Sequence, residues 1–282
     1  MRVVVFVSDY HLFVSGVCIK HLPNLNENVS DITIITPNIE RHQKFYTSLG
    51  FNNLSYLSDL DVCKRLDIPS CRLSWVDKQY AILNLDRLFD DETVFNIDAD
   101  VILNRPVKVT NGEQRIFYLE SEYYPWYFKT IREFFGLKKS LKGNDSFIAD
   151  FMVFDKKYLE EMKASSPAFA NYQTWRNVID NNTPSEQDII EWLTPLPIDE
   201  VYVTPAISEY ETYGTWIRAN YRNIVILDRS SPTYGNTADH QTIIPTEEYL
   251  AENKSIISMR FSQQDSEQYW QLIYPNLWDK FK

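Results

Sequence analysis

The stretch "VFNIDADVILNRP", residues 94–106, runs from a buried apolar strand into two aspartates and leaves as a second apolar segment. Side chains at positions i and i+2 of an extended chain lie on the same face, so Asp98 and Asp100 are expected to point at one site. Paired carboxylates are the hard oxygen ligands that Mg²⁺ and Mn²⁺ prefer. The alternative is structural, with one carboxylate capping a turn and the other paired with Arg105.

The segments before this stretch predict a parallel sheet. Short apolar runs alternate with runs of helical spacing, and Gly50 stands where a helix C-cap is expected. This βαβα succession is typical of an α/β domain with a mostly parallel central sheet and helices on both faces. Ligands of such sheets bind beyond the carboxyl ends of the strands, where the aspartates are expected. The expected strands are 2–7, 31–37, 54–57 and 93–100, and the expected helices are 15–22, 38–51 and 71–89.

The second half of the chain is less regular. A helix is expected within 182–193, with Thr183 as N-cap, Pro184 at the first helical position and Glu186 completing a capping box. No Gly/Ser linker or repeat marks a boundary, so residues 1–282 are predicted to form one domain. The other expected elements are strands 115–121, 146–155, 200–205 and 223–227, a helix at 156–162, and a helix over 262–278 broken by Pro275.

Composition narrows the classes of partner. The formal charge of the 282 residues is −11 and no cluster of Lys and Arg reverses it locally, which argues against nucleic acid. No segment approaches the length of a membrane helix. The three cysteines form no CxxC pair, which favours reduced thiols and a cytoplasmic protein. Peripheral contact with membrane-held acceptors stays open, although the acidic charge opposes attraction to anionic lipid.

The chain has few glycines for a phosphate-binding protein. It contains seven, with neither a GxGxxG nor a GxxxxGK[ST] pattern, so no dinucleotide fingerprint or P-loop is present. A phosphate ligand would therefore be held through a metal ion, helped by scattered arginines. That arrangement is typical of metal-dependent enzymes that use nucleotide sugars.

Several motifs carry a resemblance to a known family. The strand ending "NIDADVILNRP" (96–106), after a helix ending "YAILNLDRLF" (80–89), resembles the DxD region of glycosyltransferases of the GT-A fold. "SFIADFMVFDKKYLEEM" (146–162) and especially "ISEYETYGTWI" (207–217) are similar to a bacterial and viral GT-A subfamily. The resemblance spans about residues 70–220, and "SEYETYG" is its more specific part. One departure lies after Trp75: the family pattern leads us to expect a Gln-rich stretch with a lysine, and this chain has Lys78, Gln79 and then Ile82.

The resemblance implies roles for residues near the strand ends. Asp100 would coordinate a Mn²⁺ or Mg²⁺ ion on the donor diphosphate, and Asp98 would contact the ribose or a metal-bound water. His240, in "GNTADHQT", would be a further metal ligand, or else an ordinary surface histidine. Asp9 and Thr36, after the first two strands, occupy positions that hold the nucleoside. Gln79 would contribute to donor binding.

The second half supplies candidates for chemistry and sugar contact. A carboxylate in an aromatic pocket can act as a general base, which favours Glu209, although Ser208 and Glu209 also fit the start of a helix. Asp150 interrupts an apolar strand, where it would bind sugar hydroxyls or make a buried ion pair. The remaining candidates are aromatic residues that either stack on sugars or belong to the core: Tyr210, Tyr213 and Trp216.

These observations predict a GT-A-type, metal-dependent glycosyltransferase acting in surface polysaccharide synthesis. Residues 1–105 would bind the nucleoside-diphosphate sugar, and 106–282 would form the acceptor half for a glycan or lipid-linked acceptor. A candidate base favours inversion, and retention stays open. The competing interpretations are a sugar-phosphate nucleotidylyltransferase, which usually has a glycine-rich N-terminal loop that "FVSDYHLFVSG" lacks, and a non-catalytic carbohydrate-binding module.

Overall fold

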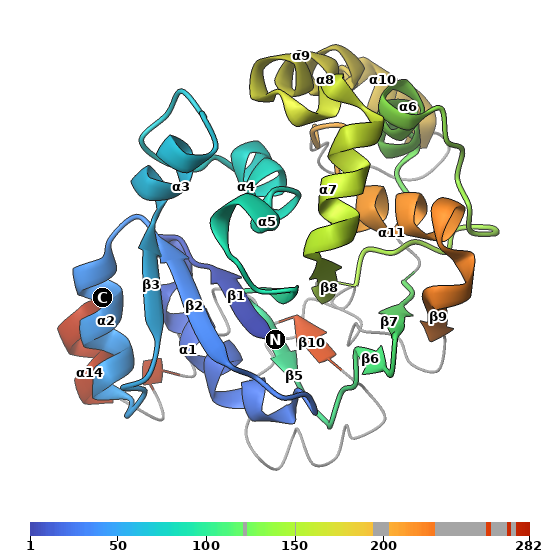
Figure 1. Cartoon of the computed structure of the whole chain (residues 1–282). Helices are drawn as coiled ribbons and strands as arrows, with labels where there is room; N and C mark the ends of the chain where they lie inside the picture. The colour runs from blue at the N-terminus through green and yellow to red at the C-terminus, as the bar shows by residue number, and fades with distance from the viewer. Residues whose placement is uncertain (121–122, 150, 194–202, 229–257, 261–269, 272–274) are drawn as a thin grey trace.

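A five-stranded sheet organises the structure, a computed structural model that describes residues 1–120, 123–149, 151–193, 203–228, 258–260, 270–271 and 275–282 (Figure 1). The strand order is β3-β2-β1-β4-β8, with β8 antiparallel to β4 and the other neighbours parallel. This confirms the predicted α/β class with a mostly parallel sheet. The strands are β1 (Arg2–Phe6), β2 (Asp31–Thr36), β3 (Ser55–Ser58), β4 (Thr93–Asp98) and β8 (Phe151–Asp155).

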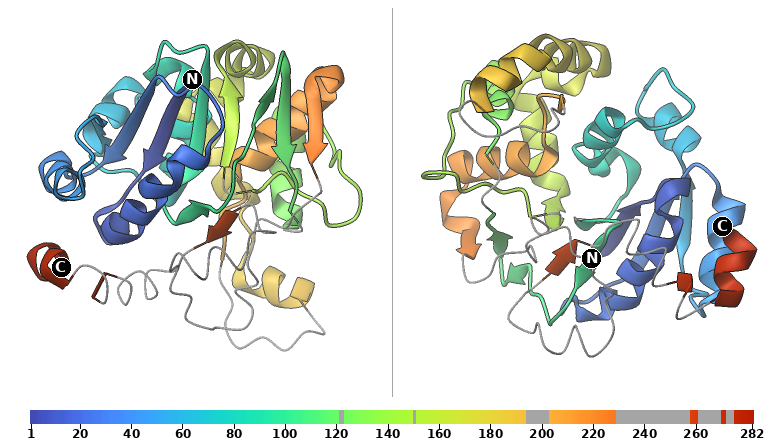
Figure 2. Two further views of the ribbon diagram at one scale, coloured as in Figure 1. Left: turned by 90° about the horizontal axis from the view of Figure 1, so that it is seen from below. Right: turned by 180° about the vertical axis from the view of Figure 1, so that it is seen from behind.

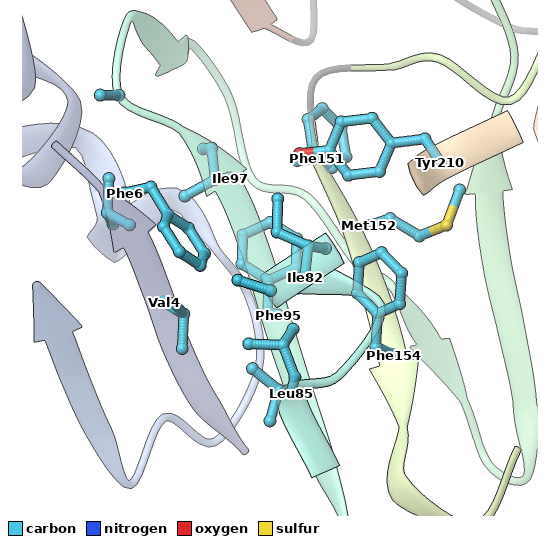
Figure 3. Packing of buried hydrophobic residues seen from close by; sticks show 14 of the residues in the cluster. Val4, Phe6, Ile82, Leu85, Phe95, Ile97, Phe151, Met152, Phe154 and Tyr210 are labelled. Atoms are coloured by element: carbon cyan, nitrogen blue, oxygen red, sulfur yellow. The ribbon is translucent and has the colours of Figure 1, made fainter. Parts of the chain in front are cut away.

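Helices cover both faces of the sheet. Helices α4 (Trp75–Ile82) and α5 (Leu85–Leu88) lie on one face and α1 (Leu12–His21) on the other (Figures 1 and 2). Apolar side chains of β1, β4 and β8 pack with Ile82 and Leu85 in one cluster (Figure 3). Sheets buried on both faces need the continuous apolar runs that the sequence shows.

The strand order reverses beside β1, and this reversal positions the candidate site. The chain builds β1, β2 and β3 outward, then returns to place β4 on the other side of β1. The carboxyl ends of β1 and β4 therefore diverge into separate connections, which opens a crevice between them. Beyond Asp98 the chain continues into β5 (Val101–Leu103), which pairs with β10 (Ser258–Arg260).

Most predicted elements of the first half are present. Helices α2 (Ile39–Ser48) and α3 (Asp59–Arg65) flank β3, and two short 3-10 helices, η1 (Asp9–His11) and η2 (Leu22–Asn24), border α1. The single helix predicted over 71–89 is instead α4 and α5. The break falls at Asn84, whose side-chain amide donates to the Tyr80 carbonyl at 2.8 Å and whose N–H bonds to the Ala81 carbonyl.

The second half adds a small sheet and a group of helices. A three-stranded sheet has the order β6-β7-β9, made of β6 (Thr110–Asn111), β7 (Gln114–Tyr118) and β9 (Val225–Asp228). Strand β8 is shorter than predicted, because Ser146 forms only an isolated bridge with Glu120. The helices are α6 (Pro125–Phe135), α7 (Lys156–Ser165), α8 (Pro167–Ala170), α9 (Tyr172–Asn182), α10 (Glu186–Leu193) and α11 (Glu209–Asn220), with η3 (Arg222–Ile224) after α11.

The predicted start of α10 is wrong by two residues. Thr183 ends α9 as its C-cap, with its hydroxyl donating to the Ile179 carbonyl at 2.8 Å. Ser185 and Asp188 cap α10 instead: each side chain accepts the backbone N–H of the other, at 3.2 and 2.9 Å. Within the described residues Val203 and Thr204 are not in a strand, whereas 200–205 was expected to be one.

The C-terminal helix α14 (Pro275–Phe281) returns to the N-terminal half, beside α2 (Figures 1 and 2). Arg41 donates to the Phe281 carbonyl at 2.6 Å. Trp270 is buried against Phe13 and Phe45, and a Cβ atom on Gly16 would lie 2.9 Å from the Trp270 ring. No helix among the described residues is long and apolar enough to span a membrane.

Candidate active site

A cavity of about 390 Å³ lies at the carboxyl ends of β1, β2 and β4, and is here called cavity 1. The connections after β1 and β2 and the N-terminal turn of α4 form its walls, where the strand order predicts a ligand site. Asp98 and Asp100 both line it, so the structure brings the predicted carboxylates to one site. Its other polar wall residues are Ser8, His11, Asp59, Ser74 and Lys78.

Asp98 makes an ion pair across the crevice. The Lys78 ammonium, on α4, lies 2.6 Å from the Asp98 carboxylate, and both side chains are about four-fifths buried. Asp98 is therefore paired with Lys78, a residue of a different element that the sequence alternative did not consider as its partner. The sequence places Lys78 next to Gln79, but it does not predict which of the two side chains faces Asp98, because this depends on how α4 packs on the sheet.

Lys78 is surrounded by carboxylates. Burial by itself would lower the Lys78 pKa, but Asp98, Glu209 and Asp100 outweigh burial and raise the pKa above its ordinary value. The ammonium therefore stays charged at neutral pH, and supplies positive charge inside an otherwise acidic crevice.

His11 is a wall residue that the sequence analysis missed. Its Nδ1 lies 2.8 Å from the Ser8 hydroxyl, which also caps the short helix η1. Burial lowers the pKa of His11, and the nearby carboxylate of Asp100 opposes the shift only in part. The imidazole is therefore neutral at pH 7, able to accept or donate one hydrogen bond toward cavity 1.

The described wall fits a divalent cation shared with a ligand better than one held by protein alone. Asp98 and Asp100 offer carboxylate oxygens, but the described residues include no group of three or more His, Cys, Asp or Glu arranged around a metal position. Mg²⁺ commonly takes one or two carboxylates and completes its shell with phosphate oxygens and water. His240 and Asp150, predicted as metal ligand and sugar-contacting acid, lie outside the described residues.

A second cavity of about 340 Å³, cavity 2, lies beside the first. Trp75, Lys78 and Asp98 line both cavities, so the two spaces meet at the Lys78–Asp98 ion pair. The far wall of cavity 2 comes from the second half of the chain. It includes Tyr127, Ile148, Val203, Thr204, Glu209 and Tyr210.

Glu209 lies in the wall of cavity 2 at the start of α11. Ser208 caps that helix by accepting the Glu211 N–H, as the structural alternative predicted. The Glu209 N–H donates to the Gln79 side-chain carbonyl at 2.9 Å, which ties α11 to α4. Gln79 is itself buried and lines cavity 2 rather than cavity 1, so its observed contact is with Glu209.

The rest of "SEYETYG" anchors α11 to the core. The Tyr210 hydroxyl accepts a hydrogen bond from the Asn96 amide of β4 at 2.6 Å, and the Tyr213 hydroxyl accepts the Asp155 N–H of β8 at 2.9 Å. Glu211 accepts the Phe147 N–H at 2.9 Å. Gly214 leaves room for the Phe147 ring, since a Cβ atom there would lie 2.3 Å from it.

This anchoring corrects the predicted sugar-stacking residues. Tyr213 and Trp216 are buried, at 0% and 4% exposure, and neither lines cavity 1 or cavity 2. They are core residues, the alternative that the sequence also allowed. Tyr210 does line cavity 2, but its ring is 2% exposed and faces Phe154.

The predicted nucleoside contacts lie next to cavity 1 and not in its wall. Thr36 is fully buried and hydrogen-bonded to the His42 imidazole, while the following residue, Pro37, lines the cavity. Asp9 is part-buried, with its carboxylate 3.7 Å from His42 and 4.0 Å from Arg41. Burial lowers the pKa of His42 to about 4, so at neutral pH the charged neighbour of Asp9 is Arg41.

No protein-family model matches the sequence. No curated protein matches it either. The bifunctional glycosyltransferase WbbM, in an apo structure, is similar with 14% identity and a TM-score of 0.47; the match covers 99% of this chain and 51% of WbbM, so the chain spans about half its length.

Two further solved structures are similar. The galactosyltransferase LgtC, solved with donor and acceptor sugar analogues, has 12% identity and a TM-score of 0.45 over 99% of this chain and 96% of LgtC. Mouse xyloside xylosyltransferase 1 has 8% identity and a TM-score of 0.44 over 84% of this chain and 91% of its own.

Proposed function

We propose that this chain is a metal-dependent glycosyltransferase that moves a sugar from a nucleoside-diphosphate sugar to a glycan or lipid-linked acceptor. The observation that carries the proposal is the meeting of two cavities at one ion pair, with paired carboxylates in the first cavity and Glu209 in the second. A transferase must hold two substrates side by side with the reacting bond between them.

In this proposal cavity 1 takes the nucleoside diphosphate. Asp59, Asp98 and Asp100 would repel a bare diphosphate, so a divalent cation is needed to offset their charge. Asp98 and Asp100 would hold that Mn²⁺ or Mg²⁺ ion, which when bound neutralises the leaving group. Lys78 adds a fixed positive charge from the opposite wall, where the diphosphate and the sugar join.

Cavity 2 then takes the transferred sugar and the acceptor hydroxyl. The Lys78 ammonium lies close enough to Glu209 to interact with it electrostatically, and this interaction contributes to the raised pKa of Lys78. A carboxylate there can accept a hydrogen bond or a proton from an acceptor hydroxyl. A base in this position favours an inverting reaction, and surface polysaccharide synthesis is the setting that we propose for it.

Donor binding gives the test of this proposal. Thermal unfolding is measured with UDP-, GDP-, CMP- and dTDP-sugars, each with Mn²⁺ and with chelator. A ligand that binds only the native state raises the melting temperature by mass action. We expect one nucleotide to raise it, and expect chelation or Asp100→Asn to abolish the increase.

Asp90→Asn is the matched control, because Asp90 is an exposed carboxylate just before β4, far from its carboxyl end. This variant should keep the full increase. An increase that survives both chelation and Asp100→Asn would contradict the metal-donor site. The absence of any increase with the wild type would contradict the transferase.

A further inference from the structure

Two tryptophans are exposed near cavity 2. Trp75, which lines the cavity, is 46% exposed, and Trp192, near the end of α10, is 40% exposed. Large aromatic side chains normally contribute to the core or to an interface, so a pair exposed around one cavity indicates a surface that meets a ligand. Val203, in the wall of cavity 2, is also exposed.

Trp192 belongs to an aromatic cluster made with Tyr124 and Trp126. The ring of Trp192 meets Trp126 edge to face at 5.4 Å and Tyr124 at 5.9 Å, and Tyr124 and Trp126 are 4.8 Å apart. Trp126 is half-buried and packs against Trp192, whose indole remains exposed to solvent. We call this group the Trp192 cluster.

The Trp192 cluster is continuous with cavity 2. The Tyr124 hydroxyl donates to the Thr204 carbonyl at 2.9 Å, and Thr204 lines the cavity. The Tyr124 ring also packs on Tyr127 at 4.8 Å, and Tyr127 lines the same cavity. Trp192 is therefore joined to the wall of cavity 2 through Tyr124.

The charges around the cluster select the class of ligand. Helix α10 carries Glu186, Asp188 and Glu191 and has no Lys or Arg, while Lys129 of α6 interacts with Asp188. The remaining carboxylates of α10 oppose an anionic lipid surface or an acidic polymer. Flat amphipathic rings beside carboxylates suit a neutral sugar, which presents C–H groups on one face and hydroxyls at its edge. The face of an indole also fits a pyranose ring better than it fits a flexible alkyl chain.

We infer that the Trp192 cluster is a binding subsite for a neutral glycan, the acceptor chain that extends out of cavity 2. The identity of this ligand as an acceptor rests on the proposed function. The subsite would bind sugar units away from the reacting end. Trp192 would therefore govern acceptor affinity and chain-length preference and leave donor binding unchanged.

The test measures glycan binding directly. Wild type, Trp192→Leu and Trp192→Phe are each titrated with neutral oligosaccharides of hexoses and N-acetylhexosamines. Binding is measured by calorimetry or by ligand-observed NMR. We expect at least one oligosaccharide to bind, Trp192→Leu to raise its Kd about fivefold or more, and Trp192→Phe to retain most of the affinity. Leucine retains apolar contact but has no flat ring for stacking. A loss of affinity in Trp192→Leu that Trp192→Phe does not show would therefore be due to the loss of stacking.

Asp100→Asn distinguishes this inference from the proposed function. It should lose the nucleotide-sugar stabilisation while it binds the oligosaccharide like the wild type. Trp192-dependent glycan binding without any nucleotide-sugar stabilisation in the wild type would support the subsite and contradict the transferase. Wild type that binds no oligosaccharide, or Trp192→Leu that binds as tightly as wild type, would overturn the subsite. So would a Trp192→Leu variant that loses co-sedimentation with phosphatidylcholine–phosphatidylglycerol vesicles and keeps its glycan affinity.

Discussion

At the scale of single residues, Lys78 links the two cavities. Its ammonium pairs with Asp98 and is held charged by three carboxylates, so the acidic crevice keeps one fixed cation even before any ligand enters. A fixed charge of this kind needs no reorganisation when negative charge develops on a leaving group.

Lys78→Met should therefore lower turnover of the nucleotide sugar by about 100-fold, the usual effect of removing one preorganised donor. Lys78→Arg should recover part of this loss. Lys156→Met is the control, because that ammonium pairs with exposed Asp90 at 3.5 Å, away from both cavities. Donor turnover by Lys78→Met equal to that of the control variant would remove Lys78 from the mechanism.

His42 gives a residue-scale prediction about pH. It is fully buried, and burial lowers its pKa to about 4 from the ordinary 6.5. Between pH 6.5 and 4, His42 is therefore protonated in the unfolded chain but neutral in the native state. The contribution of His42 to the free energy of unfolding is complete above pH 6.5 and is lost as the pH falls toward 4. The loss should approach about 3 kcal/mol.

Urea unfolding of wild type and His42→Gln between pH 7 and 4 measures this effect. The variant is expected to be less stable at pH 7 but to lose less of its free energy of unfolding as the pH falls. Parallel stability curves for the two proteins across this range would show that His42 is not the group responsible.

At the scale of elements, "SEYETYG" acts as an anchor that positions Glu209 in the wall of cavity 2. Tyr210, Glu211 and Tyr213 fasten α11 to β4, to the Phe147 loop and to β8, and this leaves Glu209 at the wall of cavity 2. The spacing of these residues indicated a helix start. It did not reveal which side chains face the core, because that depends on strands far away in the sequence.

Gly214→Ala tests the anchor. The new methyl group would lie 2.3 Å from the Phe147 ring, so we expect a loss of about 1–3 kcal/mol in the free energy of unfolding from overpacking. Phe147→Leu in the same chain should relieve part of that loss, and a double-mutant cycle in urea measures the coupling. Purely additive effects of the two substitutions would contradict a direct clash.

The same scale shows what local sequence can predict. The strands β1 to β4 and helices α1 and α2 follow from apolar runs and spacing, because each signal is strong and local. The start of α10 was misplaced because Thr183 and Ser185 are both plausible caps two residues apart, and the choice depends on how α9 ends. The split between α4 and α5 depends on one side-chain hydrogen bond of Asn84.

At the scale of the whole molecule, the candidate site joins distant parts of the chain. Asp98 and Asp100 could be predicted to share a site because they lie two residues apart at the end of β4. The predicted strand over 93–100 nevertheless ends at Asp98, since Ala99 and Asp100 form a turn. Cavity 2 could not be predicted from the sequence, because its wall combines residues of α4 with residues 203–210. Trp192 is connected to that wall through Tyr124 and Thr204. Similarly, Trp270 and α14 return to pack on α1 and α2.

Glu209→Gln tests the central claim, that two adjoining cavities divide donor binding from transfer, most directly. The measurement compares nucleotide-sugar stabilisation with the rate of nucleoside-diphosphate release in the same preparation. The account predicts that Glu209→Gln keeps the stabilisation of the wild type and loses about 100-fold or more in release, since a general base contributes on that order. Release at the wild-type rate, or loss of donor binding together with release, would contradict the assignment of Glu209 to the transfer step in cavity 2.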